Sequence, residues 1–71
     1  MEPDNARGRL AVVVEHWMEH NRGHEEEFSK WAEKAKDSGY RVVSDRILEA
    51  ASQMNKANDF LRDALAELED A

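Results

Sequence analysis

The sequence predicts an all-α fold, an antiparallel helical hairpin of two long helices over about residues 5–37 and 40–69. Three observations predict this fold. Apolar residues in the second half recur in a heptad pattern, residues in the first half favour helix, and one strong turn signal separates the two halves. No run shows the alternating pattern of a strand. We therefore expect a single helical domain over residues 1–71.

The first predicted helix begins close to the N-terminus. Pro3 suits the first turn of a helix, and Asp4 or Asn5 can cap it. Residues 21–23 are an alternative turn that would give a three-helix bundle, because glycine inside a helix costs about 1 kcal/mol relative to alanine. A continuous or gently kinked helix is the better prediction, since only a long first helix covers the second one along its whole length.

The turn between the helices is predicted at "DSGY", residues 37–40. Gly39 suits the left-handed conformation that closes a helix, and Lys34 and Lys36 favour the negative end of the preceding helix. Folding the chain about Gly39 places residue i of the first helix opposite roughly residue 78 − i of the second. The two predicted helices are then of nearly equal length.

The second helix carries the clearest pattern, a heptad repeat that is typical of coiled-coil packing. Its apolar positions are Tyr40, Val43, Ile47, Ala50, Met54, Ala57, Leu61, Ala64 and Leu68. The first helix carries a matching stripe with one extra step of four residues after His24, a mild stutter. That stripe consists of Leu10, Val13, Trp17, His20, His24, Phe28, Trp31, Ala35 and Ser38.

Two helices alone cannot enclose a core. Trp17, Trp31 and Phe60 extend the apolar surface beyond a single seam, and a lone hairpin would expose that surface as a patch that drives association. We therefore expect a two-fold homodimer that forms a four-helix bundle. A monomeric three-helix bundle is the alternative, and another protein is a further candidate partner.

Composition excludes several classes of function. The chain has no cysteine, so disulfides and thiolate metal sites are excluded. Ten Lys and Arg against sixteen Asp and Glu give a net charge of −6, which disfavours nucleic acid and anionic membrane surfaces as partners. The longest apolar run, "LAVVV" at residues 10–14, is too short for a signal peptide or a membrane span. We expect a cytoplasmic protein.

All three histidines lie four residues apart in "EHWMEHNRGHEEEF", residues 15–28. Side chains at that spacing share one face of a helix, and neutral imidazole binds zinc, nickel, copper and iron. The predicted metal ligands are His20 and His24, with His16 as a third candidate. The candidate supporting groups are Met54, Asn58 and Asn21, because the hairpin pairing places His24 opposite Met54 and His20 opposite Asn58. Alternatively, the histidines are polar residues that fix the register of the helices without any metal.

Catalytic motifs are missing, so we expect no enzymatic activity. The chain has no cysteine nucleophile, no glycine-rich phosphate loop and no H-E-x-x-H run. The Glu-x-x-His pattern of di-iron bundles is also lacking, because the positions three before the histidines hold Val13, Trp17 and Asn21.

The run "HWMEHNRGHEEEFSKWAEKA", residues 16–35, with the following turn and helix, resembles a small, uncharacterised all-helical prokaryotic domain family. The signature of that family is similar to H-W-x-E-H-N-x-x-H-x-x-x-F/Y-x-x-W-A, and the resemblance covers about residues 10–68. The family is sometimes associated with nickel-binding accessory proteins of the carbon monoxide dehydrogenase maturation kind. The resemblance implies nickel or another transition metal as the ligand, and the matching positions are His16, His20, Asn21 and His24.

Two functions remain open from the sequence. The first is a small metal-binding hairpin, which binds nickel, zinc or a similar ion through His20 and His24 across a dimer and buffers or delivers that ion. The second is a metal-free oligomerisation or protein-interaction module, in which the histidines are only polar residues of the seam. Added metal should raise thermal stability under the first hypothesis and not under the second.

Overall fold

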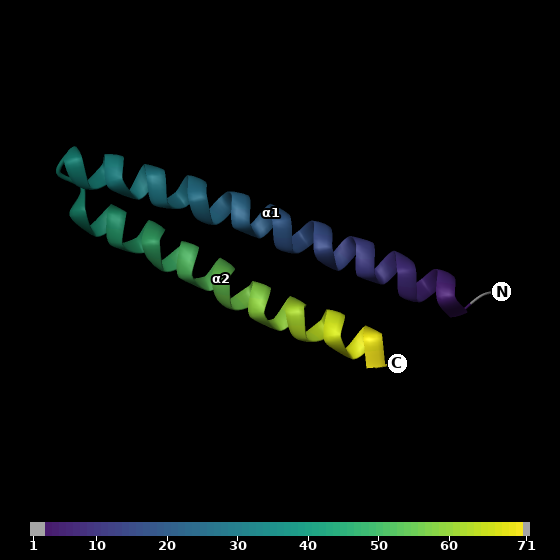
Figure 1. Cartoon of the computed structure of the whole chain (residues 1–71). Coiled ribbons are helices and arrows are strands. Elements are labelled where there is room, and N and C mark those ends of the chain that lie inside the picture. Colours follow the sequence, from purple (N-terminus) through teal and green to yellow (C-terminus); the bar gives the residue numbers. More distant parts are fainter. Residues whose placement is uncertain (1–2, 71) are drawn as a thin grey trace.

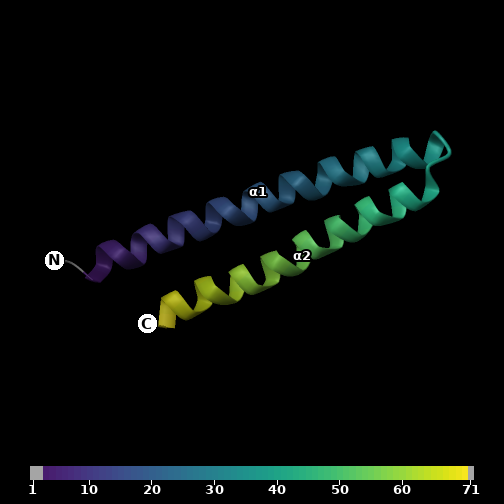
Figure 2. The same ribbon diagram turned by 180° about the vertical axis from the view of Figure 1, so that it is seen from behind.

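The computed structural model describes residues 3–70 and confirms the predicted helical hairpin. Helix α1 spans Pro3–Asp37 and helix α2 spans Arg41–Asp70, and residues 3–70 contain no strand. Figure 1 and the reverse view in Figure 2 show the two helices side by side along their length, joined by one tight turn. The hairpin is a rod with dimensions of 57 × 14 × 12 Å.

The turn is built as the sequence predicts. Gly39 has a φ of 92°, in the left-handed region that glycine adopts without a steric penalty. The amide of Tyr40 donates to the carbonyl of Ala35 at 2.8 Å, and the amide of Gly39 donates to the carbonyl of Lys36 at 3.0 Å. These two bonds form a Schellman motif, which pairs the last carbonyls of α1 and reverses the chain.

Helix α1 continues without a break through Asn21, Arg22 and Gly23. The three-helix alternative with a turn at residues 21–23 is therefore wrong. A Cβ added to Gly23 would meet nothing within 4 Å, so no close packing contact requires glycine at this position.

The seam between the helices follows an unbroken 3,4 repeat on both of them. The buried or half-buried seam residues of α1 are Ala11, Val14, Met18, Asn21, Glu25, Phe28, Ala32 and Ala35. Those of α2 are Ser44, Ile47, Ala51, Met54, Asn58, Leu61, Leu65 and Leu68. The predicted stutter in α1 is therefore wrong, because a regular heptad repeat runs through the whole helix.

Most of the predicted α1 stripe lies one residue away from the true seam. Trp17 and Trp31 are 50% and 56% exposed, whereas the neighbouring Met18 and Ala32 are buried. Leu10 and Val13 are likewise exposed beside buried or half-buried neighbours. The physical reason is close packing, because mostly small or flexible side chains let α1 approach α2 closely while its indole rings lie at the side of the seam.

The α2 stripe is correct at alternate positions. Ile47, Met54, Leu61 and Leu68 line the seam as predicted. At the other heptad position the seam uses the next residue along, so that Ser44 and Ala51 are buried while Val43 and Ala50 are exposed.

The displaced residues form one surface, which we call the tryptophan face. All of them immediately precede a seam residue, and in two antiparallel right-handed helices such residues point to the same side of the hairpin. The face consists of Leu10, Val13, Trp17, His20, His24 and Trp31 from α1 and Val43, Ala50, Ala57 and Ala64 from α2. Residues of both helices line its shallow apolar grooves, Phe28 with Val43 and Ala50 near the turn, and Leu10 with Ala64 near the termini.

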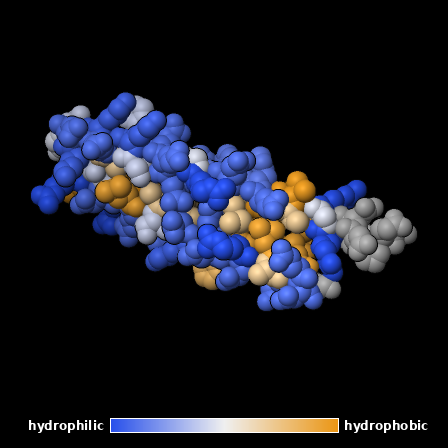
Figure 3. Space-filling model, viewed as in Figure 1, coloured by the Kyte–Doolittle hydropathy of each residue, from blue (hydrophilic) through white to orange (hydrophobic). Residues whose placement is uncertain are grey.

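In the view of Figure 3 the surface is mainly hydrophilic, and smaller apolar areas lie toward both ends of the rod. The side opposite the tryptophan face is mainly polar, although Val12 and Leu48 are also exposed there. Its polar residues include Glu15, Glu19, Arg22, Glu26, Asn55, Asp59 and Arg62. In the described part of the chain, neither helix contains an apolar stretch long enough to cross a bilayer.

Candidate metal-binding site and the buried asparagine pair

His20 and His24 lie on consecutive turns of α1 with their rings turned toward each other. Their Nε2 atoms are 2.9 Å apart, and the ring centroids are 4.5 Å apart at an interplanar angle of 80°. The ring of Phe28 lies 5.5 Å from that of His24 and supports its other side. Since α1 is continuous here, the helix backbone fixes the spacing of the two imidazoles.

His16 is set apart from this pair. Its ring centroid lies 6.4 Å from that of His20, with the rings tilted by 32°, and its side chain is exposed. Of the three predicted histidine ligands, the structure therefore brings together His20 and His24 and leaves His16 beside them.

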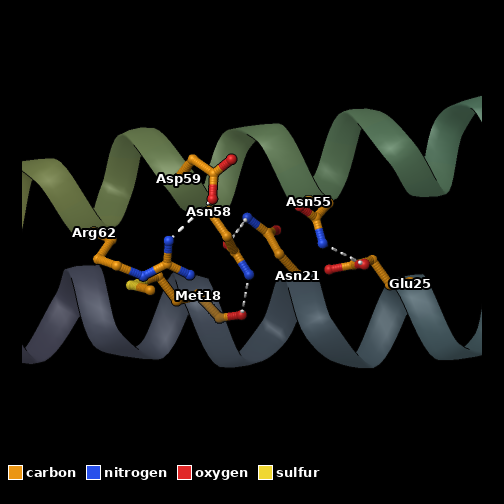
Figure 4. Close-up of polar contacts among 7 residues, drawn as sticks. All are labelled: Met18, Asn21, Glu25, Asn55, Asn58, Asp59 and Arg62. Carbon is orange, nitrogen blue, oxygen red and sulfur yellow. Dashed lines mark hydrogen bonds and ion pairs between the residues drawn. The ribbon is translucent and has the colours of Figure 1, made fainter.

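An asparagine pair links the two helices at the same level. Nδ2 of Asn21 donates to Oδ1 of Asn58 at 2.9 Å, and Nδ2 of Asn58 donates to the main-chain carbonyl of Met18 at 3.0 Å (Figure 4). Asn58 is only 4% exposed. One turn away, Nδ2 of Asn55 donates to Oε1 of Glu25 at 3.3 Å. These bonds fix the register of the hairpin, because a shift of either helix would leave buried amide groups unpaired.

The predicted supporting residues lie in the seam. Asn21 and Asn58 direct their amides at each other, and Met54 is half-buried between the helices. The sequence placed Asn58 at the correct level but did not pair it with Asn21. Two asparagines at opposing seam positions were the signal for this pair, and the misplaced α1 stripe concealed it.

The family described as "Domain of unknown function (DUF8180)" matches residues 10–68. The chain belongs to the DUF8180 family. The match includes most of both helices and the whole turn, so the hairpin itself is the DUF8180 domain. No curated protein and no solved structure matches the chain.

The DUF8180 hairpin offers an ion two nitrogen ligands from one chain. The described residues contain no group of three or more His, Cys, Asp or Glu side chains placed to hold a metal ion. The close approach of the Nε2 atoms of His20 and His24 requires one ring to donate and the other to accept. If both rings are protonated at Nδ1, each Nε2 carries a free lone pair instead, and the two nitrogens can then act as ligands of a cation.

Proposed function

We propose that the DUF8180 hairpin is a small, non-enzymatic protein that binds a divalent transition metal through Nε2 of His20 and His24. The observation that carries the proposal is the 2.9 Å separation of these two nitrogens. Two imidazoles on one helix face can reach a common ion without any movement of the backbone. Imidazole nitrogen suits nickel, copper and zinc better than magnesium or calcium, which prefer oxygen ligands.

The separation of the nitrogens favours nickel or copper within this group. If the rings keep the 2.9 Å spacing of their hydrogen-bonded pair when they bind an ion, metal–nitrogen bonds of about 2.0–2.1 Å enclose an angle of roughly 90° at the ion. That angle matches square-planar or octahedral coordination, whereas zinc sites are usually tetrahedral. The resemblance of residues 16–24 to a histidine signature associated with nickel accessory proteins supports the same choice.

A site with two protein ligands suits a carrier or buffer. Structural metal sites are usually closed by four protein ligands, whereas this pair leaves coordination positions open to water or to a receiving protein. An ion held in this way exchanges readily. We therefore propose that the hairpin accepts and releases its metal as an accessory or buffering protein.

Isothermal titration of the full chain with Ni²⁺, Cu²⁺ and Zn²⁺ tests the proposal. We expect binding of one ion per chain, with Ni²⁺ or Cu²⁺ bound more tightly than Zn²⁺, because the angle at the ion suits both and the affinity order places Cu²⁺ above Zn²⁺. The double variant His20→Gln/His24→Gln should abolish the binding. Glutamine keeps the site polar and helix-compatible, so circular dichroism should show an unchanged helix content.

His16→Gln is the matched control, since His16 lies on the same helix outside the converging pair. It should leave the affinity within about twofold of the parent. Binding that is absent in the parent protein, or that His16→Gln reduces as much as the double variant does, would contradict the proposal.

A second candidate function is a metal-free oligomerisation or protein-interaction module, and the exposed tryptophan face favours it. Under this function the histidines are polar members of an interface. Thermal stability and assembly would then be the same with and without metal, and the double histidine variant would bind no less metal than its parent.

A further inference from the structure

The hairpin exposes more surface than a self-contained protein of its size. Its accessible surface is 5752 Å², whereas a compact monomer of 8.2 kDa should expose about 4,500 Å². The excess of about 1,200 Å² exceeds the roughly 800 Å² that each partner buries in a standard protein–protein interface. The area available for burial is therefore sufficient for a stable dimer.

The tryptophan face has large side chains on one helix and small ones on the other. Leu10, Trp17, His24 and Trp31 follow one another at intervals of seven residues on α1. Val43, Ala50, Ala57 and Ala64 follow at the same interval on α2. A partner that fits this surface must itself carry small and large residues in the complementary arrangement, and a second copy of the chain has them.

We propose that a second copy of this chain covers the tryptophan face, with its turn at the same end, so that α1 of each copy packs on α2 of the other. This dimer goes beyond the proposed metal function and does not depend on it. The two-fold axis then runs parallel to the helices. Each α1 has antiparallel neighbours on both sides, as in many four-helix bundles.

The register follows from the contacts inside one hairpin. Asn21 meets Asn58 and Glu25 meets Asn55, so residue numbers at one level of the rod add up to about 78. A two-fold axis parallel to the rod keeps both copies at the same levels. Residue i of α1 in one copy therefore lies at the level of about residue 78 − i of α2 in the second copy.

These levels place each large side chain between two small ones. Trp17 falls level with residue 61 of the second copy, between its Ala57 and Ala64. Trp31 falls between Val43 and Ala50 of the second copy by the same register. This is knobs-into-holes packing, in which large residues fill spaces that small residues leave open.

Phe60 also becomes covered in this arrangement. It is 75% exposed in one hairpin and lies on the same side as Ala57, one helical turn farther along. Phe60 of one copy falls level with Trp17 of the other, which accounts for an exposed aromatic residue that has no place in the core of a single hairpin. Arg46 similarly falls level with Trp31 of the second copy, where a guanidinium can pack on the indole ring.

The opposite orientation, with the turns at different ends, fits the surface less well. It would stack α1 on α1 and α2 on α2, so that indoles oppose indoles while alanines oppose alanines. The two contacts would then demand different distances between the helix axes, because that distance depends on the side chains in contact. In the proposed orientation both contacts are identical.

The histidine pairs of the two copies remain separate in this dimer. His20 and His24 lie on α1, and the two α1 helices are diagonally opposed. Each copy therefore keeps its own two-nitrogen group. His24 itself belongs to the covered face, so dimerisation is tested on metal-free protein and metal binding by its own titration, and the failure of one proposal can be told from the failure of the other.

Sedimentation equilibrium of the metal-free full chain, at a concentration of tens of micromolar, tests whether a second copy covers the tryptophan face. We expect the mass of a dimer. Ala50→Glu should give monomers, because it places a carboxylate opposite Trp31 of the second copy. Ala66→Glu is the matched control: Ala66 is an equally exposed alanine of α2 on the other side, and this variant should remain dimeric.

The relative orientation of the two hairpins can be measured with a spin label that lies outside the proposed interface. The chain has no cysteine, so Lys36→Cys provides a single site for a spin label near the turn, on the side away from the tryptophan face. Double electron–electron resonance should give a distance below about 35 Å, as two hairpins with axes about 10 Å apart require. A monomeric parent protein, or a distance of about 50 Å expected from helices of this length running to opposite ends, would overturn the proposal.

Discussion

Nδ2 of Asn21 donates a hydrogen bond of 2.9 Å to Oδ1 of Asn58 and so joins the two helices at the middle of the hairpin. Asn58 is at the same time a donor to the carbonyl of Met18. Among the described residues, the ion pairs Arg46–Glu49 and Arg62–Asp59 both lie within α2 and are exposed, so they contribute little to the fold. The alignment of the helices therefore depends on the asparagine pair, the bond from Asn55 to Glu25 and the apolar seam.

Asn58→Ala should lower the free energy of unfolding by about 1–3 kcal/mol, because it removes two hydrogen bonds and leaves the amide of Asn21 without its partner. Asn21→Ala should cost less, since Asn21 is only half-buried. A double-mutant cycle by urea denaturation should give a coupling of about 0.5–1.5 kcal/mol between the two residues. Strictly additive effects would show that the bond contributes nothing to stability.

Gly39→Ala should lower the free energy of unfolding by about 1–2 kcal/mol, because an L side chain is strained in the left-handed conformation. Its φ is 92°, and a Cβ there would meet nothing within 4 Å, so the penalty is conformational and not a clash. Gly39→Asn is the control and should cost less, since asparagine tolerates this region better. Equal stabilities of the parent and Gly39→Ala, measured by chemical denaturation, would contradict the turn geometry.

Gly23→Ala should have the opposite effect to Gly39→Ala and raise the free energy of unfolding by about 1 kcal/mol. Gly23 is exposed in the middle of α1, and an added Cβ finds open space. The comparison with Gly39→Ala separates a glycine that the turn requires from one that the helix merely tolerates. A loss of stability on this substitution would mean that α1 bends at Gly23.

Metal should raise the melting temperature, and the increase should grow with the logarithm of the free metal concentration above the dissociation constant. A ligand present at about 100 times its dissociation constant stabilises the folded state by about 2.7 kcal/mol if it does not bind the unfolded chain. Thermal melts followed by circular dichroism should show this increase for the parent and for His16→Gln, and no increase for His20→Gln/His24→Gln. Coincident melts of the parent with and without Ni²⁺ would argue for the metal-free function.

Much of the fold could be predicted from local chemistry. Gly39 lies between two long stretches that favour helix, and the left-handed turn it predicts is present. The register could also be predicted, because the position of the turn determines which residues of the two helices lie opposite each other. The continuous passage of α1 through Gly23 followed from matching the lengths of the helices.

The rotation of α1 could not be predicted in the same way. Two neighbouring stripes of that helix are apolar, and the size of Trp17 and Trp31 predicts that the stripe through them forms the core. The structure instead buries the stripe of Met18 and Ala32 and tolerates Asn21 and Glu25 in the seam. Hydrogen bonds that join α2 to Asn21, Met18 and Glu25 make that choice favourable, and a pattern confined to one helix does not reveal them.

The sequence predicts that the histidines share one side of the helix, but not which of their rings approach each other. A spacing of four places His16, His20 and His24 on one side of the helix, and this spacing alone does not rank them. The ring orientations make the distinction, since the rings of His20 and His24 approach to 4.5 Å and those of His16 and His20 to 6.4 Å.

The most direct measurement of the central claim is a nuclear magnetic resonance titration of the imidazole nitrogens with diamagnetic Zn²⁺ in place of nickel. If one ion bridges the two rings, the Nε2 signals of His20 and His24 shift together to saturation at one ion per chain, while the Nε2 signal of His16 and the helix content stay unchanged. Nε2 signals of His20 and His24 that do not move, or that move no more than that of His16, would contradict the shared site.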